Sequence, residues 1–312
     1  MQPIIFIIGP TATGKTKSAF LLAKELGGQI ISCDSMLIYK EPEIITAKPA
    51  QYMLDEVKHH FIGVVSVKKT YNVFDYYSQA LSKIIELNQK GIPVIVCGGS
   101  GLYVKALCDG IFEEPVKDET LRQRLTQRLE KEGSDVLYQE LKGVDPQAAK
   151  KISSNDARRI IRALEVYQAS GIPISVKQKK VRGLRSDFKV QMFGLNVERK
   201  ALYERINERT DEMFANEVIE EVKGLLKIPL SITAGKIIGI KEIGAFLDSK
   251  ISEEEARELM KKNTRNFAKR QLTWFRKDKR IKWIDINNKT TEEIKDEILR
   301  DTRYEQRDTK YA

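Results

Sequence analysis

The sequence predicts an α/β fold, with a parallel sheet covered by helices on both faces and an inserted all-helical domain. Three observations support this class. Predominantly apolar runs occur at 3–8, 29–33 and 92–97, which is typical of strands buried on both faces. Helical patterns separate these runs, as parallel strands require. Between 117 and 185 the pattern stays helical and contains no convincing strand.

The first half of the chain alternates strands with helices. The run 3–8 leads through a loop into a helix that stops at Gly27. The helix predicted at 74–88 is closed by Gly91. Its apolar side chains recur at helical spacing, namely Phe74, Tyr77, Leu81, Ile84 and Ile85. We expect residues 1–116 to form the first part of the core.

The helical insertion is expected at 117–186. One of its helices is capped by Asn155 or Asp156 and ends at Gly171. Four residues are expected on the buried side of that helix, namely Ile160, Ile161, Leu164 and Tyr167.

Strand character returns at 190–196, in the second part of the core, which is expected at 187–300 and includes a basic C-terminal helix. Ser252 and Glu255 form a capping box ahead of a long helix that runs to about Phe275. The polar residues 301–312 are expected to form a tail.

Positive charge is concentrated in two blocks. The chain has 54 Lys and Arg against 44 Asp and Glu, a formal net charge of +10. Residues 117–185 hold 16 basic and 9 acidic side chains, and residues 257–282 hold 11 and 2. Solvated helix faces are one explanation, but this asymmetry favours a protein that binds nucleic acid.

Composition excludes several classes of protein. Hydrophobic residues make up 41% of the chain and charged residues 31%, as in soluble globular proteins. No apolar run approaches the ~20 residues of a membrane span. The three cysteines, Cys33, Cys97 and Cys108, are too widely spaced for a disulfide framework or a Cys-x-x-Cys site. The chain opens without a secretory signal pattern, so we expect a cytoplasmic protein.

A phosphate-binding loop follows the first strand. Residues 9–16 fit G-x-x-x-x-G-K-[ST] between a strand and a helix: Gly9, Pro10, Thr11, Ala12, Thr13, Gly14, Lys15 and Thr16. Backbone N–H groups of this P-loop would surround a diphosphate, Lys15 would reach the terminal phosphates, and the Thr16 hydroxyl would ligate Mg²⁺. The core is therefore expected to be P-loop NTPase-like. The loop leaves the reaction open, because a kinase and an enzyme that releases diphosphate can share it.

Polar residues follow two further strands. Asp34 and Ser35 come after the strand at 29–33, and Ser100 follows the strand at 92–97. All three belong at the carboxyl edge of the sheet, where α/β proteins bind ligands. Asp34 could act as a general base, assist in holding Mg²⁺, or only cap a turn.

The sequence resembles the tRNA dimethylallyltransferase family, also called tRNA isopentenyltransferases, from residue 3 to about 285. The segments that carry the resemblance, in order, are 9–16, 34–39, 46–49, 59–60, 98–103, 155–166, 238–242 and 264–274. It implies transfer of a dimethylallyl group from dimethylallyl diphosphate to N6 of the adenosine 3′-adjacent to the anticodon in tRNA, with release of diphosphate.

The resemblance also implies roles for individual residues. Asp34 would take the proton from the amine, and Ser100 would supply a hydroxyl where the family usually has Thr. Lys15, the loop amides and Mg²⁺ would stabilise the leaving diphosphate. Arg205 and Arg209, four apart on a predicted helix, are further candidate clamps, although a solvated basic face is equally consistent with them.

The same resemblance implies contacts with the tRNA anticodon stem-loop. The residues expected to bind it are Asp34, Ser35, Met36, Leu37, Ser100, Arg122, Arg158, Arg159, Ile160, Ile161, Arg162, Lys236, Lys241, Lys269, Arg270, Gln271, Thr273, Trp274 and Arg276. Lys236 and Lys241 are expected on one helix. Trp274 and Phe275 could stack on bases, but helical spacing favours the core for both.

Some positions depart from the family or lie outside its chemistry. Ile45 stands where Gly is usual, and Ile240 where Tyr is usual. His59 and His60 have no nearby Cys or acidic residue that could complete a metal site, so both are interpreted as structural.

Three other functions would each explain part of this sequence. A P-loop kinase of a nucleotide or small metabolite would need no basic blocks. A prenyltransferase of free adenine nucleotide would need no tRNA surface, and a non-catalytic RNA-binding protein would need neither Lys15 nor Asp34. The expected partners are therefore tRNA and dimethylallyl diphosphate, with Mg²⁺ as cofactor. The mechanism requires no second chain, so a monomer is expected.

Overall fold

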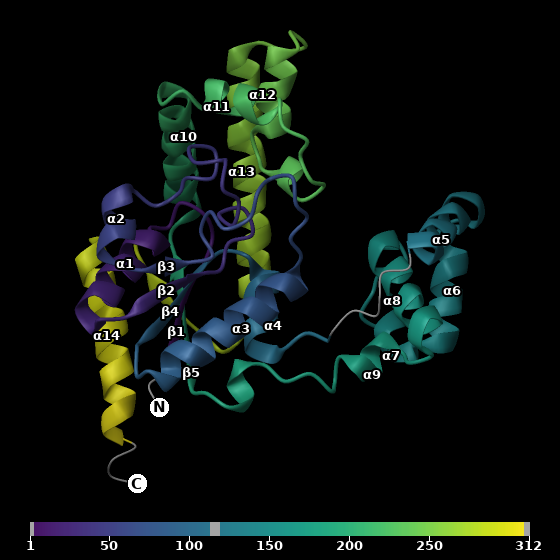
Figure 1. Ribbon diagram of the computed structural model, residues 1–312, viewed down its shortest axis with the longest axis horizontal. Coiled ribbons are helices and arrows are strands. Elements are labelled where there is room, and N and C mark those ends of the chain that lie inside the picture. Colours follow the sequence, from purple (N-terminus) through teal and green to yellow (C-terminus); the bar gives the residue numbers. More distant parts are fainter. Residues whose placement is uncertain (1–2, 113–118, 309–312) are drawn as a thin grey trace. The chain divides into compact units, whose positions relative to one another are not determined.

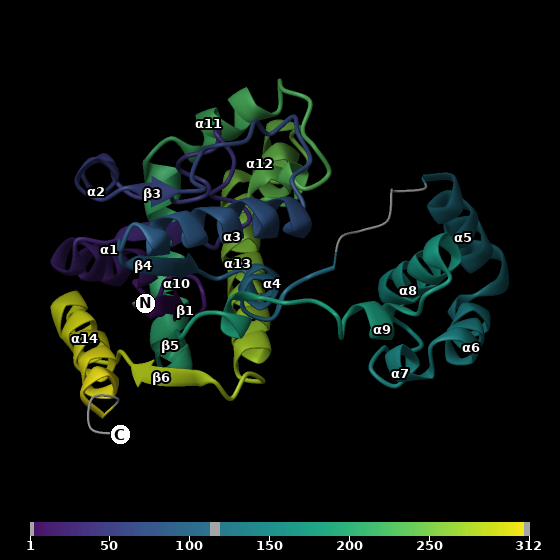
Figure 2. The ribbon, with the colours of Figure 1, turned by 60° about the horizontal axis from the view of Figure 1, so that its bottom comes forward.

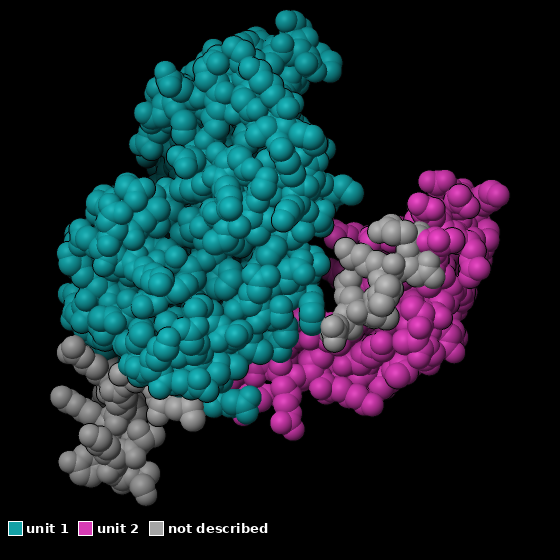
Figure 3. Space-filling view, viewed as in Figure 1, with its two compact units in different colours: residues 1–108, 187–312 teal, residues 109–186 magenta. Residues whose placement is uncertain are grey.

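Two compact units make up the chain in the computed structural model, which describes residues 3–112 and 119–308. The first unit contains Met1–Cys108 and Asp187–Ala312, and the second contains Asp109–Ser186 (Figure 3). The second unit thus ends where the helical insertion was predicted to end and begins eight residues earlier than predicted.

The first unit is built on a six-stranded parallel sheet in the order β3-β2-β4-β1-β5-β6 (Figure 1). Its strands are β1 (Ile4–Ile8), β2 (Gln29–Ser32), β3 (His59–His60), β4 (Val94–Gly98), β5 (Val190–Asn196) and β6 (Ile281–Asp285). All residues of β1 and β4 are buried, so both faces of the sheet are covered. The predicted parallel α/β fold is confirmed. Because β1 and β2 both pair with β4, the loops after these three strands lie side by side.

Nine α-helices accompany this sheet among the described residues of the first unit. They are α1 (Lys15–Leu26), α2 (Gln51–Glu56), α3 (Val73–Gln89), α4 (Gly101–Asp109), α10 (Arg199–Ala215), α11 (Val218–Leu225), α12 (Ile240–Leu247), α13 (Glu253–Phe275) and α14 (Thr291–Asp308). Helix α13 packs against α10 and α12, and α14 packs against α1 (Figure 2). The capping box of Ser252 and Glu255 and the helix end at Phe275 are confirmed.

Of the five apolar residues at helical spacing in α3, only Ile84 is buried. The buried residues of the helix are Tyr76, Ala80, Ile84 and Leu87, whereas Phe74 and Tyr77 are only partly buried. The ring of Tyr76 stacks on the ring of Tyr103 in α4, with centroids 4.0 Å apart. The buried face of α3 thus contains Tyr76 and Ala80, each one residue before the apolar positions Tyr77 and Leu81.

The C-terminal region also differs from the prediction of a tail. Helix α14 continues to Asp308, and Ile294, Ile298 and Leu299 are buried in the same core cluster as residues of α1. The tail predicted from residue 301 is wrong as far as 308, and 309–312 lie outside the described residues.

The second unit is helical throughout its described residues. It contains α5 (Glu119–Glu132), α6 (Ser134–Val144), α7 (Pro146–Ala149), α8 (Ala157–Ser170), α9 (Ile174–Lys177) and the 3₁₀ turn η1 (Leu184–Ser186). It has a core of its own, in which Leu125, Leu141 and Leu164 are completely buried or nearly so. Asp156 caps α8, whose end at Gly171 has a positive φ of 65°, as the sequence predicted. Within the described ranges, no helix is long and apolar enough to cross a bilayer.

Candidate active site

Three loops meet at the carboxyl edge of the sheet. The N–H of Cys33, after β2, donates to the carbonyl of Cys97 in β4 at 2.7 Å. The N–H of Ser100 donates back to the carbonyl of Cys33 at 3.1 Å. Gly98 pairs with Ile8, the last residue of β1 before the P-loop. The sheet therefore brings the P-loop, Asp34 and Ser100 to one place.

The P-loop is sharply curled between β1 and α1. Gly9 has a φ of +142°, and a Cβ there would lie 2.8 Å from the carbonyl oxygen of Leu195. Gly14 has a φ of +78° and immediately precedes α1. Ala12 also has a positive φ, 62°, which is unfavourable for a residue with a Cβ. Such a loop is held by its surroundings, and the N-terminus of α1 at its end is a favourable place for an anion.

Lys15 lies folded against its own loop, where its Nζ donates a hydrogen bond to the carbonyl of Pro10. Burial lowers the pKa of Lys15 to about 8, while the nearby Cys97 and Asp34 act in the opposite direction. The positive charge of Lys15 is therefore costly until an anion lies beside it.

A second cation reaches the P-loop from α10. The Nη1 of Arg209 donates to the hydroxyl of Thr11 at 3.1 Å. Burial lowers the pKa of Arg209, and the negative charge of Asp34 opposes that effect. Of the two predicted clamps, Arg209 thus contacts the loop, while Arg205 lies partly buried one turn earlier on the same helix. Arg209 remains positively charged near neutral pH, because guanidinium groups do not deprotonate in proteins.

Asp34 and Ser100 are both held by hydrogen bonds. Oδ1 of Asp34 accepts from the N–H of Met36 at 2.9 Å. The Ser100 hydroxyl accepts from the N–H of Ser35 at 2.9 Å and donates to its hydroxyl at 3.2 Å. The turn-capping role considered for Asp34 is therefore present, and it orients the carboxylate near Lys15 and Arg209.

The sequence prediction placed Gln271 on the tRNA-binding surface, whereas the structure places it in the interior. Its side chain is buried, with 6% of the residue exposed. Oε1 accepts from the N–H of Thr11 at 2.9 Å, and Nε2 donates to the carbonyl of Gly99 at 2.9 Å. Gln271 therefore belongs to the loops of the site, and a direct contact with tRNA is excluded by its burial.

The other predicted residues of α13 do face outward. The exposed side chains are Lys269, Arg270, Thr273, Trp274 and Arg276. Phe275 is in the core, as predicted, but the same prediction for Trp274 is wrong, because 42% of that residue is exposed. The ring of Trp274 packs on Gly101, where a Cβ would lie 2.3 Å from it. An aromatic surface therefore adjoins the loop that carries Ser100.

The predicted helix that carries both Lys236 and Lys241 is wrong. Lys236 ends the 3₁₀ turn η2 (Ala234–Lys236), and α12 begins only at Ile240, after Gly239 with a φ of +107°. Both lysines are nevertheless exposed. With Arg270 they line one hollow, which Gly235, Ile237, Ile238, Glu242 and Asn263 complete.

In the second unit, α8 separates its charged and apolar residues. Arg158 and Arg159 are exposed, and Arg162 donates to the buried Glu165 at 3.0 Å. Ile160 is completely buried and Ile161 nearly so. These two isoleucines pack in the core of the helical unit, so their predicted contact with tRNA is wrong.

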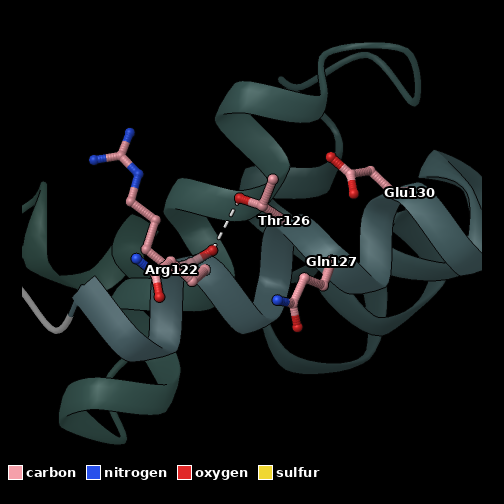
Figure 4. A pocket seen from close by; sticks show the side chains of 5 residues that line it. Arg122, Thr126, Gln127 and Glu130 are labelled. Carbon is pink, nitrogen blue, oxygen red and sulfur yellow. Dashed lines mark hydrogen bonds between the residues drawn. The ribbon is translucent and has the colours of Figure 1, made fainter.

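Arg122 lies on α5, where it lines a hollow with Gln123, Thr126, Gln127 and Glu130. Figure 4 shows that this hollow belongs to the side of one helix, with the Thr126 hydroxyl bonded to the carbonyl of Arg122. The hollow lacks the converging groups of a catalytic site, so we regard it as surface relief.

Thr16 is the candidate magnesium ligand. It stands in the first turn of α1, at the end of the P-loop. Across 3–112 and 119–308 no cluster of three His, Cys, Asp or Glu side chains could hold a metal. Mg²⁺ commonly binds through one or two protein oxygens together with substrate phosphates, and the Thr16 hydroxyl fits that mode.

The histidines have structural partners. Nδ1 of His59 lies 2.7 Å from the carbonyl of Val57, and Nε2 of His60 lies 2.8 Å from Oε1 of Gln29. Burial lowers the pKa of His60 to about 4 and also lowers that of His59. Both rings are thus neutral near pH 7. Their hydrogen bonds tie the edge strand β3 to Val57 and to Gln29.

Comparisons with known proteins agree on one family. The family model for IPP transferase matches residues 37–278. A tRNA dimethylallyltransferase of Carboxydothermus hydrogenoformans is 43% identical over 301 residues, which cover 96% of each chain. The crystal structure of a tRNA isopentenylpyrophosphate transferase from Bacillus halodurans, 33% identical, matches with a TM-score of 0.73 over 100% of both chains.

A eukaryotic dimethylallyltransferase acting on tRNA, 26% identical, matches with a TM-score of 0.77 over 92% of this chain and 75% of the other. Three kinds of comparison thus reach the same result, and the curated relative and the solved structures cover more than 90% of this chain. The chain belongs to the IPP transferase family.

Proposed function

We propose that this protein transfers the dimethylallyl group of dimethylallyl diphosphate to N6 of the adenosine 3′-adjacent to the anticodon in tRNA and releases diphosphate. The observation that carries this proposal is the convergence of a P-loop, two cations and a carboxylate at one sheet edge. Relatives that cover nearly the whole chain support the same reaction.

The cradle acts on the leaving group. As the carbon–oxygen bond breaks, negative charge grows on the diphosphate, and Lys15, Arg209 and the loop amides stabilise it. Both cations are already held on the loop, so little reorganisation is required during the reaction. Mg²⁺, held by the Thr16 hydroxyl and the phosphates, would supply further neutralisation of that charge.

Asp34 acts on the nucleophile. The lone pair of the exocyclic amine is delocalised into the adenine ring, so the amine attacks poorly while it keeps its protons. Asp34 accepts one of them as the carbon–nitrogen bond forms. Its bond with the N–H of Met36 orients the carboxylate, and Ser100 braces the same turn through Ser35. Ser100 is thus placed to position the turn and to offer a hydroxyl near the amine.

Access to the amine requires a surface that holds the RNA. A base stacked in the anticodon loop must be extruded before N6 can enter the site, which costs a few kcal/mol. Exposed cations in each unit supply contacts for the RNA, on the outer face of α13 in the first unit and on α5 and α8 in the second. Beside Ser100, the exposed ring of Trp274 offers a stacking platform. We further propose that the enzyme acts in the cytoplasm as a monomer.

One incubation separates this function from that of a P-loop kinase. The purified protein receives Mg²⁺, unmodified tRNA and labelled dimethylallyl diphosphate, while a parallel tube holds γ-labelled ATP and small acceptors. Transfer of label to tRNA at adenosine N6 supports the proposal. Consumption of ATP with no label on tRNA would favour the kinase.

A further inference from the structure

Gln271 links two loops that are far apart in the sequence. It lies in α13, 260 residues from Thr11 and 172 from Gly99, and its side-chain amide bonds to the backbone of both. An amide carries a donor and an acceptor on one rigid plane, so it can satisfy an N–H and a carbonyl at the same time. The P-loop and the loop after β4 are thereby held at a set separation.

The side-chain amide of Gln271 packs closely against Gly99. A Cβ on Gly99 would lie 2.2 Å from Nε2 of Gln271 and 3.2 Å from the carbonyl oxygen of Gly9. On the other side, the N–H of Thr11 precedes Ala12, whose left-handed backbone is unfavourable outside a supporting structure. The bond to Gln271 therefore supports the P-loop next to its strained residue.

The helix that carries Gln271 is itself anchored to α10. Lys261 of α13 pairs with Asp211 of α10 at 2.8 Å, and Arg265 donates to Oδ1 of Asn207 at 2.6 Å. Helix α10 also carries Arg209, which holds the Thr11 hydroxyl. The backbone and the side chain of Thr11 are thus fixed from one helix pair, a rigid support for the loop.

We infer that Gln271 is a positioning residue that keeps the P-loop in its diphosphate-binding shape and at the correct distance from the loop that bears Ser100. This inference rests on the proposed function and deepens it. It assigns the shape of the cradle to a helix whose outer face carries exposed cations, while the buried amide bonds to the backbone of the two loops.

Gln271→Met is the direct test, because Met is close to Gln in volume and offers neither amide group. Calorimetric titration with inorganic diphosphate and Mg²⁺ should show affinity about tenfold weaker than in the parent protein, the order expected for two lost hydrogen bonds. Affinity for tRNA should stay within about twofold. Lys269→Ala, on the exposed face of the same helix, should show the reverse pattern.

Unchanged diphosphate affinity in folded Gln271→Met would overturn the inference, as would a loss confined to tRNA binding. The titration needs no prenyl transfer, so its outcome is independent of the reaction. If the parent protein transfers no prenyl group, the proposed function fails while a tenfold weaker diphosphate affinity still supports the role of Gln271.

A second measurement needs no variant. In the parent protein without diphosphate, the N–H of Thr11 should exchange slowly with solvent, because it is bonded to a buried acceptor. Exchange of that amide at the rate of an open loop would overturn the inference, whether or not Gln271→Met folds.

Discussion

The sheet edge of the first unit and the surface of α8 in the second both present cations, but they hold them differently. Lys15 and Arg209 lie against the P-loop with hydrogen bonds to it, and burial lowers the pKa of both. Arg158 and Arg159 are exposed on a helix. Fixed, partly desolvated charges suit a small anion whose charge changes during a reaction. Exposed charges suit a flexible polyanion bound in water.

Replacement of the Asp34 carboxylate should give the largest difference between an effect on prenyl transfer and an effect on tRNA binding. Asp34→Asn keeps the side-chain shape and an acceptor for Met36 but removes the base, so single-turnover transfer on bound tRNA should fall by ~10²–10⁴. Affinity for tRNA should be nearly unchanged, because binding depends on the exposed cations. Asp55→Asn, on the exposed side of α2, is the matched control. Equal losses in binding and turnover would remove the assignment of Asp34 as base.

The pH dependence of donor binding should report on Lys15. With a pKa of about 8, the amine loses its charge as the pH rises through 8, and diphosphate prefers the charged form. Affinity for dimethylallyl diphosphate should therefore fall above pH 8, by up to about tenfold per pH unit. Lys15→Arg keeps its charge throughout this range and should flatten the profile. Equal slopes in both proteins would place the titration elsewhere.

Removal of the exposed arginines should give the opposite result to Asp34→Asn. In Arg158→Ala/Arg159→Ala, tRNA affinity should fall by about tenfold, and the slope of its logarithm against log salt should decrease by about one to two. Filter binding at several salt concentrations measures both. Arg128→Ala is the control, because Arg128 is paired with two carboxylates, Glu132 and Glu140, whereas Arg159 has one such partner among the described residues, Asp156. An unchanged slope in the double variant would show that these arginines do not contact phosphates.

Arg162 should behave differently from its neighbours on α8. Its bond to Glu165, whose side chain is 6% exposed, means that Arg162→Ala leaves a buried carboxylate without this partner. The free energy of unfolding of the protein should fall by about 1–3 kcal/mol in urea titrations. Arg162→Ala/Glu165→Gln should recover part of the loss. An unchanged free energy of unfolding in both variants would show that the bond between Arg162 and Glu165 does not stabilise the fold.

The contrast also explains what the sequence could predict. The P-loop, the strand ends and Asp34 follow from a motif and from apolar strands, whose geometry is local. The basic residues of α8 and α13 could also be identified from the sequence. The role of Gln271 could not be predicted, because the sequence does not show whether a neutral amide among cations points outward or into the protein. Its contacts with Gly99 and Thr11 determine that it points inward.

Other differences arise in the same way. In strand β6, at the edge of the sheet, Ile281 and Ile284 are buried while the charged Lys282 and Asp285 are exposed, so the strand lacks the continuous apolar run of β1. Helix α14 did carry a signal, since Ile294 and Ile298 are four residues apart, and its overall polarity masked that spacing. Ile160 and Ile161 were predicted both to lie on the buried side of their helix and, through the resemblance, to contact tRNA; their burial is confirmed, and it argues against the contact.

The most direct test of this division of labour is single-turnover prenyl transfer by Arg158→Ala/Arg159→Ala at saturating tRNA. If the sheet edge performs the chemistry and the exposed arginines only hold the RNA, the rate constant should equal that of the parent protein once all tRNA is bound. A rate constant that stays at least tenfold lower at saturation would contradict the account, because these arginines would then contribute to the transition state.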